Sequence, residues 1–355
     1  MDKFRIDSHK LIYHVDRVND WQKNKNIYPL YMEISPAGAC NHRCTYCGLD
    51  FMEYKPRFLK TEVLKDRISE MGSLGLKSIM YAGEGEPLLH KDMLDITLHT
   101  EKSGIDVAFT TNGVFLDKDF ADAALTSITW VKVSINGATK DTYNKIHRGK
   151  SDDLDKVMHN MAYANDVRRS NNYKCTLGMQ IMLLPDNYQE VGKLAQRAKD
   201  IGMDYLVVKP YSHHPQSNTT EYKDIKYDNY LQLKDELSQY NDEQFHVVFR
   251  INSMKKWDKG EHGYTHCLAL PFWSYIDAGG NVWGCSVYLG DERFLYGNIH
   301  EQTFREIWEG EKRRASLEWV KNELDTCNCR VNCRMDEVNK YLWDLKHPSE
   351  HVNFI

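Results

Sequence analysis

The feature that most constrains this chain is a group of three cysteines, Cys40, Cys44 and Cys47, spaced C-x3-C-x2-C. They follow residues 28–34, an apolar segment typical of a β-strand. Four thiolates would complete a tetrahedral zinc site or saturate an iron-sulfur cluster, whereas three on a 4Fe-4S cluster leave one iron open to a further ligand. The spacing therefore predicts a metal centre with an open coordination position. A zinc site completed by another residue, such as His42, is the alternative.

The composition is that of an ordinary soluble globular protein. Of the 355 residues, 41% are hydrophobic and 27% are charged. The sequence has no run of about 18 apolar residues that would span a bilayer, and its start lacks the apolar core of a signal peptide. The net charge of -5 argues against nucleic-acid binding through phosphate contacts. We therefore expect a cytoplasmic protein that binds neither membranes nor nucleic acid.

Residues 28–212 alternate predicted strands with predicted helices. Apolar residues recur at helical spacing over residues 61–74, 153–165 and 191–201, and six strand-like segments surround these helices. Right-handed crossovers between such strands imply a parallel sheet, either doubly wound or curled into a partial barrel. The sequence therefore predicts an α/β fold.

Five loops with chemically active residues each follow a predicted strand. Because the carboxyl ends of parallel strands lie on one rim, where active sites of such folds form, we expect these loops to converge. They are residues 40–47, 83–87, 111–113, 134–137 and 209–214.

A second group of cysteines lies toward the carboxyl end. Nine cysteines in a reducing compartment indicate metal or redox chemistry rather than disulfide bonds. Residues 273–284 have the pattern of a β-hairpin, a helix is predicted from about Thr303, and the thin core predicts a domain stapled by metal. Cysteine ligation alone does not separate iron-sulfur from zinc, so both stay open here. The five cysteines are Cys267, Cys285, Cys327, Cys329 and Cys333.

The chain divides into five predicted regions. They are an N-terminal helical segment over residues 1–27, the α/β core over 28–212, a polar connector over 213–262, the cysteine-bearing domain over 263–340 and a tail over 341–355.

The first cysteine loop, with Tyr46 just before its third cysteine, resembles the cluster loop of the radical S-adenosylmethionine (SAM) superfamily. The resemblance implies a partial (β/α)6 TIM-like barrel and a 4Fe-4S cluster whose open iron binds SAM. In that family one electron from the cluster cleaves SAM to a 5'-deoxyadenosyl radical, which abstracts hydrogen from the substrate.

The resemblance also implies a set of SAM contacts. The loop Gly83-Glu84-Gly85-Glu86-Pro87 is similar to the family's Gly-Gly-Glu-Pro element, which holds the methionine amino group, but Glu84 stands where a glycine is usual. Ser134 and Asn136 would bond the ribose hydroxyls, and Arg148 would pair with the SAM carboxylate. Tyr46 would lie against the adenine, and Thr111 and Asn112 near the ribose or the substrate; a turn role for Asn112 is the alternative.

The second cysteine group resembles the SPASM/twitch extension of radical SAM enzymes, which carries auxiliary 4Fe-4S clusters. Five cysteines suffice for one such cluster, held by Cys267, Cys285 and two of Cys327, Cys329 and Cys333. The expected cofactors are thus SAM and two 4Fe-4S clusters, with a structural zinc as the alternative at the second site.

No catalytic residue is identified by the sequence, but four candidates lie at the active rim. Gln180 lies toward the end of the fifth predicted strand, and Lys209, Tyr211 and His213 follow the sixth. They would bind a polar substrate or act as acid and base, or belong to an ordinary solvated loop. Cys175 begins its strand, at the opposite rim, so we expect a buried, inert thiol.

The resemblance favours a radical SAM oxidoreductase acting on a small polar substrate, namely a sugar, nucleotide sugar or aminocyclitol. The auxiliary cluster would accept the electron left on the substrate, and flavodoxin or ferredoxin would supply the reducing electron. The main alternative is a peptide maturase that cross-links or epimerises a ribosomal peptide. A non-catalytic electron carrier or zinc scaffold is the third.

Overall fold

The computed structural model describes residues 3–6 and 8–354, and its centre is one ten-stranded sheet. The strand order is β10-β9-β8-β1-β2-β3-β4-β5-β6-β7. The strands are β1 (Tyr31–Ile34), β2 (Ser78–Tyr81), β3 (Asp106–Thr111), β4 (Trp130–Ser134), β5 (Thr176–Leu183), β6 (Tyr205–Pro210), β7 (His246–Phe249), β8 (Trp273–Ile276), β9 (Asn281–Trp283) and β10 (Leu295–Asn298).

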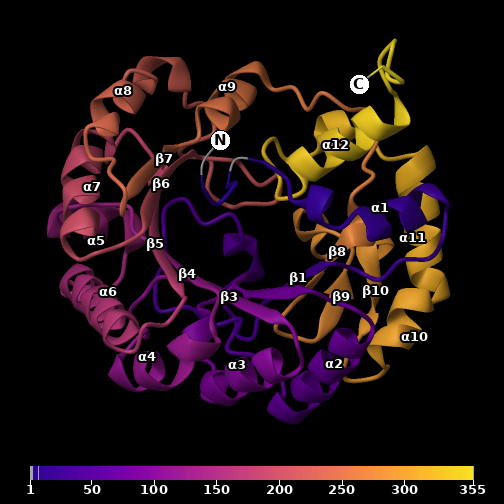
Figure 1. Cartoon of the computed structure of the whole chain (residues 1–355), viewed down its shortest axis with the longest axis horizontal. Coiled ribbons are helices and arrows are strands. Elements are labelled where there is room, and N and C mark those ends of the chain that lie inside the picture. Colours follow the sequence, from indigo (N-terminus) through magenta and orange to yellow (C-terminus); the bar gives the residue numbers. More distant parts are fainter. Residues whose placement is uncertain (1–2, 7, 355) are drawn as a thin grey trace.

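Strands β1 to β7 pair in parallel and in sequence order, and they curve around a central space with helices on the outside (Figure 1). The ring does not close, since the sheet runs on into β8, β9 and β10 instead. The predicted partial barrel is therefore confirmed. The run from β1 to β7 has one strand more than the six predicted, because β7 lies within residues 213–262, which were predicted to be a connector.

The helices cover the outer face of the curved sheet (Figure 1). In α2 the apolar stripe Leu64, Ile68 and Met71 is fully buried, and burial of each such side chain contributes roughly 1.5–3 kcal/mol. The described helices are α1 (Val15–Gln22), α2 (Thr61–Ser73), α3 (Met93–Lys102), α4 (Lys118–Ala124), α5 (Lys140–His147), α6 (Asp153–Ser170), α7 (Val191–Asp200), α8 (Leu233–Ser238), α9 (Ile251–Lys259), α10 (Phe304–Glu309), α11 (Glu311–Asn322) and α12 (Asp336–Lys346).

None of the described helices combines the length and apolar character needed to cross a membrane.

Alternation along the strands decides which side chains enter the barrel. In β4, Val131 and Val133 are fully buried among the core residues under the helices, whereas Lys132 and Ser134 are only half-buried and face the interior. Two faces of one strand thus serve different purposes, because successive side chains point to opposite sides of a sheet. The outer faces build the core and the inner faces line a polar space.

The carboxyl-terminal cysteine domain continues the same sheet. Strand β8 pairs in parallel with β1, and the predicted hairpin forms between β8 and β9 around Asp277, with β10 adding a further antiparallel strand. The helix predicted from Thr303 begins there with a reciprocal capping box between Thr303 and Glu306. The two cysteine-bearing regions therefore share one hydrogen-bonded framework.

Candidate active site

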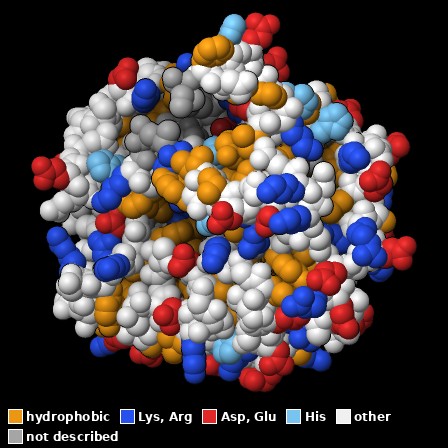
Figure 2. All heavy atoms as spheres, turned by 45° about the vertical axis from the view of Figure 1, so that its right-hand side comes forward, with side chains coloured by type: hydrophobic (Ala, Val, Ile, Leu, Met, Phe, Trp, Pro, Cys, Tyr) orange, Lys and Arg blue, Asp and Glu red, His pale blue; other side chains and the backbone are white. Residues whose placement is uncertain are grey.

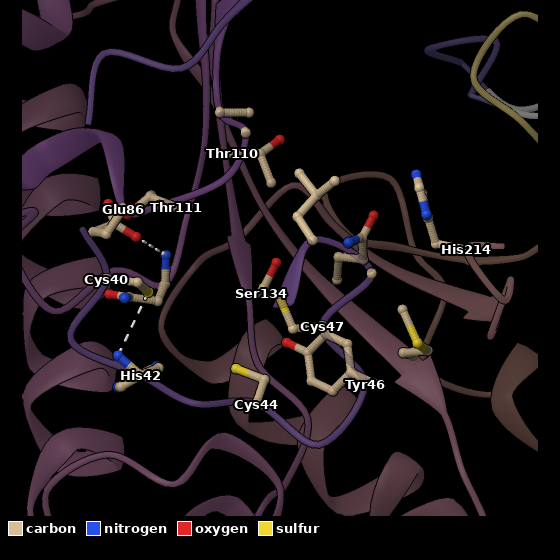
Figure 3. A pocket seen from close by; sticks show the side chains of 18 of the residues that line it. Cys40, His42, Cys44, Tyr46, Cys47, Glu86, Thr110, Thr111, Ser134 and His214 are labelled. Atoms are coloured by element: carbon tan, nitrogen blue, oxygen red, sulfur yellow. Dashed lines mark hydrogen bonds between the residues drawn. The ribbon is translucent and has the colours of Figure 1, made fainter. Parts of the chain in front are cut away.

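The first cysteine group lies in a cavity of about 280 Å³ at the carboxyl ends of the parallel strands. Cys40, Cys44 and Cys47 follow β1, and Figure 3 shows them along one loop with Tyr46 among them. Burial raises the pKa of the Cys40 thiol to about 12 and raises those of Cys44 and Cys47 as well. Thiolates at these positions need a bound cation to balance their charge, so the donor set fits a metal centre.

The spacing of the thiols distinguishes between kinds of metal centre. Within residues 3–6 and 8–354, one set of three metal-ligating atoms lies within 4.8 Å of one another. These atoms belong to His42, Cys44 and His147. The three cysteines do not meet that limit, whereas thiolates on one zinc ion lie about 3.8 Å apart. His42 Nε2 is also bonded to Asp153 at 2.9 Å. The wider spacing favours a cluster over a zinc ion completed by His42.

A histidine behind the loop is poised to donate to one of the sulfurs. Nε2 of the buried His147 accepts the backbone N–H of Asn136 at 2.9 Å, so the ring proton lies on Nδ1, 3.5 Å from Cys44 Sγ. Burial holds the pKa of His147 well below its usual range, which keeps the ring neutral. The Cys44 sulfur therefore receives a fixed N–H donor.

The loop after β2 approaches the cysteine loop so closely that glycine is required at two positions. A Cβ on Gly83, whose φ is +117°, would lie 2.5 Å from Ser35 Cβ, and one on Gly85 would lie 2.2 Å from the Ala39 carbonyl oxygen. Glu84, between them, points away from the cavity. Its carboxylate pairs with Arg57 at 2.7 Å and accepts the backbone N–H of Ala278, in the hairpin turn, at 2.7 Å.

Glu86, the second acid of this loop, lines the cavity. Its carboxylate accepts the hydroxyl of Thr111 and the backbone N–H of Asn112, the latter at 2.8 Å (Figure 3). Burial raises the pKa of Glu86 to about 7 in the absence of a bound cation. A ligand ammonium group beside it would restore the charged form, since opposite charge lowers a carboxyl pKa.

The second cysteine group gathers four of its five thiols. Burial raises the pKa of Cys267 to about 11 and raises the pKa values of Cys285, Cys329 and Cys333. The charge of Cys267 adds to the effect of burial on Cys285 and Cys333, so these thiols lie near one another. Cys327, by contrast, is exposed on the surface.

Two side chains donate toward this second set. The Tyr288 hydroxyl lies 3.3 Å from Cys329 Sγ, and the Asn339 amide donates to Cys267 Sγ at 3.6 Å. The group therefore has both buried thiols and hydrogen-bond donors directed at them, the surroundings typical of metal-bound sulfur.

Two family models match this chain: the radical SAM superfamily over residues 34–198 and the SPASM iron-sulfur cluster-binding domain over residues 267–334. The chain is a radical SAM protein with a SPASM domain. The cofactors of such proteins are SAM and 4Fe-4S clusters, and the predicted family and cofactors are confirmed at this level.

Relatives of this radical SAM protein carry several functions. It is 26% identical over 316 residues to the AdoMet-dependent heme synthase of Methanosarcina barkeri. The aligned region covers 83% of this chain and 87% of that protein. It is 21% identical over 331 residues to the tungsten-containing aldehyde ferredoxin oxidoreductase cofactor-modifying protein of Pyrococcus furiosus, covering 86% and 88%. The GTP 3',8-cyclase of Paenarthrobacter nicotinovorans is 30% identical over 123 residues. This aligned region covers only 33% of this chain and 34% of that protein.

Solved structures show the same fold. Streptococcus suis SuiB bound to S-adenosylmethionine has a TM-score of 0.65 at 17% identity, covering 96% of this chain and 79% of that one. Native anSMEcpe with bound AdoMet has a TM-score of 0.60 at 19% identity, covering 88% of each.

Most of the residues predicted to contact SAM in the radical SAM core come together around the cavity. Asn136 donates to the Tyr46 hydroxyl at 2.7 Å and accepts the backbone N–H of Met182 at 2.6 Å, so it holds Tyr46 against β5. The Asn112 amide bonds Asn41 and the Val114 backbone, which supports its turn role. The predicted SAM-contact residues that line the cavity are Tyr46, Gly83, Gly85, Glu86, Thr111, Asn112, Ser134 and Asn136.

Two predicted cofactor residues lie outside the cavity. Helix α5 ends at His147, and Arg148 follows in the left-handed conformation with its side chain exposed, so the geometry does not bring it to the SAM site. Glu84 is the other, as its contacts with Arg57 and Ala278 explain.

The four catalytic candidates divide in the same way. Gln180 and Lys209 line the cavity. Tyr211 is buried and bonds His213 Nδ1 at 3.1 Å, and neither residue contributes to the lining. Cys175 is buried, as expected, and borders a separate hollow beside Asp106 and Thr129 at the amino ends of the strands.

Sequence reasoning missed several residues of the site. Arg330 and Arg334, from the loop around Cys333, line the cavity, as does Glu33 from β1. His214, after β6, lines it too (Figure 3). His214 Nε2 donates to the Ser286 carbonyl at 3.1 Å. The cysteines marked the carboxyl-terminal loop, but no local pattern shows that its arginines reach the barrel.

Proposed function

We propose that this radical SAM protein is an oxidoreductase that abstracts hydrogen from a small polar substrate held inside the partial barrel. The substrate class would be a sugar, nucleotide sugar or aminocyclitol. One observation carries the proposal: the cavity that contains Cys40, Cys44 and Cys47 extends to Ser286 and Arg330, the neighbours in sequence of Cys285 and Cys329. A substrate in that cavity lies between the two cysteine groups.

The residues of the first site have separable roles in the proposal. Cys40, Cys44 and Cys47 hold the 4Fe-4S cluster, and Glu86 accepts the ammonium group of SAM. Gly83 and Gly85 keep that loop close to the cysteine loop, where a larger side chain would clash. When bound, the cluster and SAM would supply hydrogen-atom abstraction from the substrate, driven by one-electron reductive cleavage of SAM. Tyr46, held by Asn136, packs beside the adenine.

The second site would hold the auxiliary cluster through Cys267, Cys285, Cys329 and Cys333. Four thiolates leave no iron open, so the assignment suits electron transfer better than ligand binding. The auxiliary cluster would accept one electron from the substrate radical, which releases a proton at the same time, and this would complete a two-electron oxidation. Cys327 is left out of the set because its side chain is exposed.

Gln180 and Lys209 are the proposed substrate contacts in the barrel. Both line the cavity from the inner faces of neighbouring strands β5 and β6. An amide offers both a donor and an acceptor, and an ammonium group offers donors, as a polar substrate requires. Flavodoxin or ferredoxin would provide the electron for SAM cleavage, in the cytoplasm.

A peptide maturase is the rival function. SuiB bound to its precursor peptide has a TM-score of 0.65 to this chain, but at 17% identity that likeness concerns the fold. Two curated relatives that span most of the chain are a heme synthase and a cofactor-modifying protein, which favours a non-peptide substrate.

Anaerobic reconstitution tests the proposal. Reduced, cluster-loaded protein given SAM is expected to release 5'-deoxyadenosine, measured by liquid chromatography and mass spectrometry. Deuterium transferred from a labelled nucleotide sugar into that product would identify the substrate class. Cluster-loaded protein that binds SAM but releases no 5'-deoxyadenosine under any reductant would overturn the enzyme assignment, and transfer only from a labelled peptide would favour the rival.

A further inference from the structure

The interior of the barrel holds a second hollow next to the cysteine cavity. Its volume is about 320 Å³. Lys209, Arg330 and Arg334 line both spaces, so the two are continuous. Together they reach the size range of pockets that hold small-molecule ligands.

Strand geometry directs two lysines into this interior. Lys132 lies between the fully buried Val131 and Val133 of β4, and Lys209 follows the fully buried Val208 of β6. Because neighbours on a strand face opposite sides, both lysines project inward. Both line the second hollow.

Two arginines enter the same space from the cysteine-bearing loop of the SPASM domain. Arg330 donates from Nε to the Ser212 carbonyl at 3.0 Å and to the Ser212 hydroxyl at 2.8 Å, which fixes its guanidinium. Arg334 pairs with Glu33 at 2.6 Å. Arg330 thus has a fixed position and further donors still available to a ligand.

The carboxylates that line the two hollows are engaged elsewhere. Glu33 is paired with Arg334, Glu86 is bonded by Thr111 on the SAM side, and Asp336 and Glu337 both pair with Lys256. Within the described part of the chain, no carboxylate forms an ion pair with Lys132, Lys209 or Arg330. The interior therefore holds a surplus of basic side chains that no lining carboxylate pairs with.

This surplus is local. The whole chain has a net charge of -5, and Figure 2 shows acidic and basic side chains interspersed over the surface in view.

Burial, and then the charges of Arg334 and Arg250, lower the pKa of Lys132 to about 7, and burial with the charge of Lys132 lowers the pKa of Lys209. Like charges enclosed together are costly, and an anion between them would relieve the repulsion.

We propose that this interior binds a small molecule that carries at least two negatively charged groups, phosphates or carboxylates, at Lys132, Lys209 and Arg330. The inference rests on the proposed function and narrows its substrate class. It favours a nucleotide sugar, whose diphosphate would meet the cations, over an aminocyclitol, whose ammonium groups they would repel.

Binding of defined anions tests the inference without knowledge of the substrate. Cluster-loaded full-length protein with SAM is titrated with inorganic pyrophosphate, with citrate and with a hexaglutamate peptide in an isothermal titration calorimeter. Saturable binding of pyrophosphate or citrate is expected, and the stronger of the two identifies phosphate or carboxylate as the anion. Absence of saturable binding by both small anions, or binding of the peptide alone, would overturn it.

Charge removal locates the binding. K132M and K209M are each expected to weaken the affinity for the better anion roughly tenfold or more, whereas K193M, which removes an exposed lysine on α7, leaves it unchanged. Equal affinity in all three variants would place the anion elsewhere. Because each inner substitution relieves repulsion between like charges, both variants are expected to melt at or above the wild-type temperature without anion, which checks that they fold.

The outcomes separate this inference from the proposed function. Wild-type protein that releases 5'-deoxyadenosine but binds neither small anion refutes the inference alone. Wild-type protein that binds pyrophosphate at Lys132 and Lys209 but never cleaves SAM refutes the enzymatic proposal alone.

Discussion

The two cysteine groups of this radical SAM protein are built by different routes. Cys40, Cys44 and Cys47 come from one loop after β1, and chain spacing alone brings them together. Cys267, Cys285, Cys329 and Cys333 come from segments before β8, after β9 and before α12, so they meet only once the hairpin and the helices have packed. All three cysteines of the local site line the 280 Å³ cavity, whereas none of the four cysteines of the assembled site lines it. The comparison indicates that the first site is suited to binding a ligand and the second to carrying electrons.

The largest expected effect comes from breaking the local site. C44S should abolish release of 5'-deoxyadenosine and reduce iron from about eight to about four atoms per chain, because one of the two clusters loses a ligand. Liquid chromatography and an iron assay measure the two quantities. A variant that keeps both the iron and the product would show that Cys44 holds no cluster.

The next prediction separates two cysteines of the assembled site. C329S should lose about four iron atoms per chain but still cleave SAM, whereas C327S, which changes an exposed thiol, should keep the wild-type iron content. Iron analysis with electron paramagnetic resonance of the reduced proteins decides between them. Equal losses from both variants would mean that Cys327 is also a ligand.

A smaller effect concerns the charged space between the sites. The pKa of Lys132 is about 7 in the folded protein but about 10.5 when unfolded, so the unfolded chain binds more protons between these values and stability should rise with pH from 7 to 10. The charged groups that face Lys132 are Lys209, Arg250, Arg334 and Glu33.

K132M should remove this contribution, so between about pH 7 and pH 10 its melting temperature should rise less than that of the wild type, by several degrees. Differential scanning calorimetry at matched pH values measures it. Taking the difference between the two proteins cancels the ionisation of cysteines, and parallel curves would contradict the assignment.

The smallest expected effect concerns the donors to sulfur. H147F removes the N–H directed at Cys44, and Y288F removes the hydroxyl near Cys329. Hydrogen bonds to cluster sulfurs raise the reduction potential, so each variant should lower the potential of its own cluster and leave the other unchanged. Redox titration followed by electron paramagnetic resonance resolves the signals of the two clusters. A variant that shifts the potential of the other cluster instead would contradict the assignment of its hydrogen bond.

The same difference between local and assembled structure explains what the sequence could predict. The cysteine loop and the loops after β2, β3 and β4 were recognisable because spacing and strand order determine where they lie. Arg148 was misplaced because the end of α5 one residue earlier turns its side chain outward. Strand β7 was missed because only four residues, His246–Phe249, interrupt a polar stretch.

Residues contributed by the assembled site were the hardest to foresee. Cys327 and Cys329 are two positions apart, and only the turn between them decides which one is buried. Arg330 enters the barrel because Ser212, 118 residues away, accepts its guanidinium. No local pattern carries such information, since it depends on where distant segments pack.

The continuation of β1 into β8 has a further consequence. Backbone hydrogen bonds join the two cysteine-bearing regions in one sheet, and Glu84 bonds the loop after β2 to the hairpin turn. The distance between the two regions is therefore fixed by the sheet. Electron transfer from a substrate in the cavity to the second cysteine group would therefore take place over a distance that the sheet holds constant.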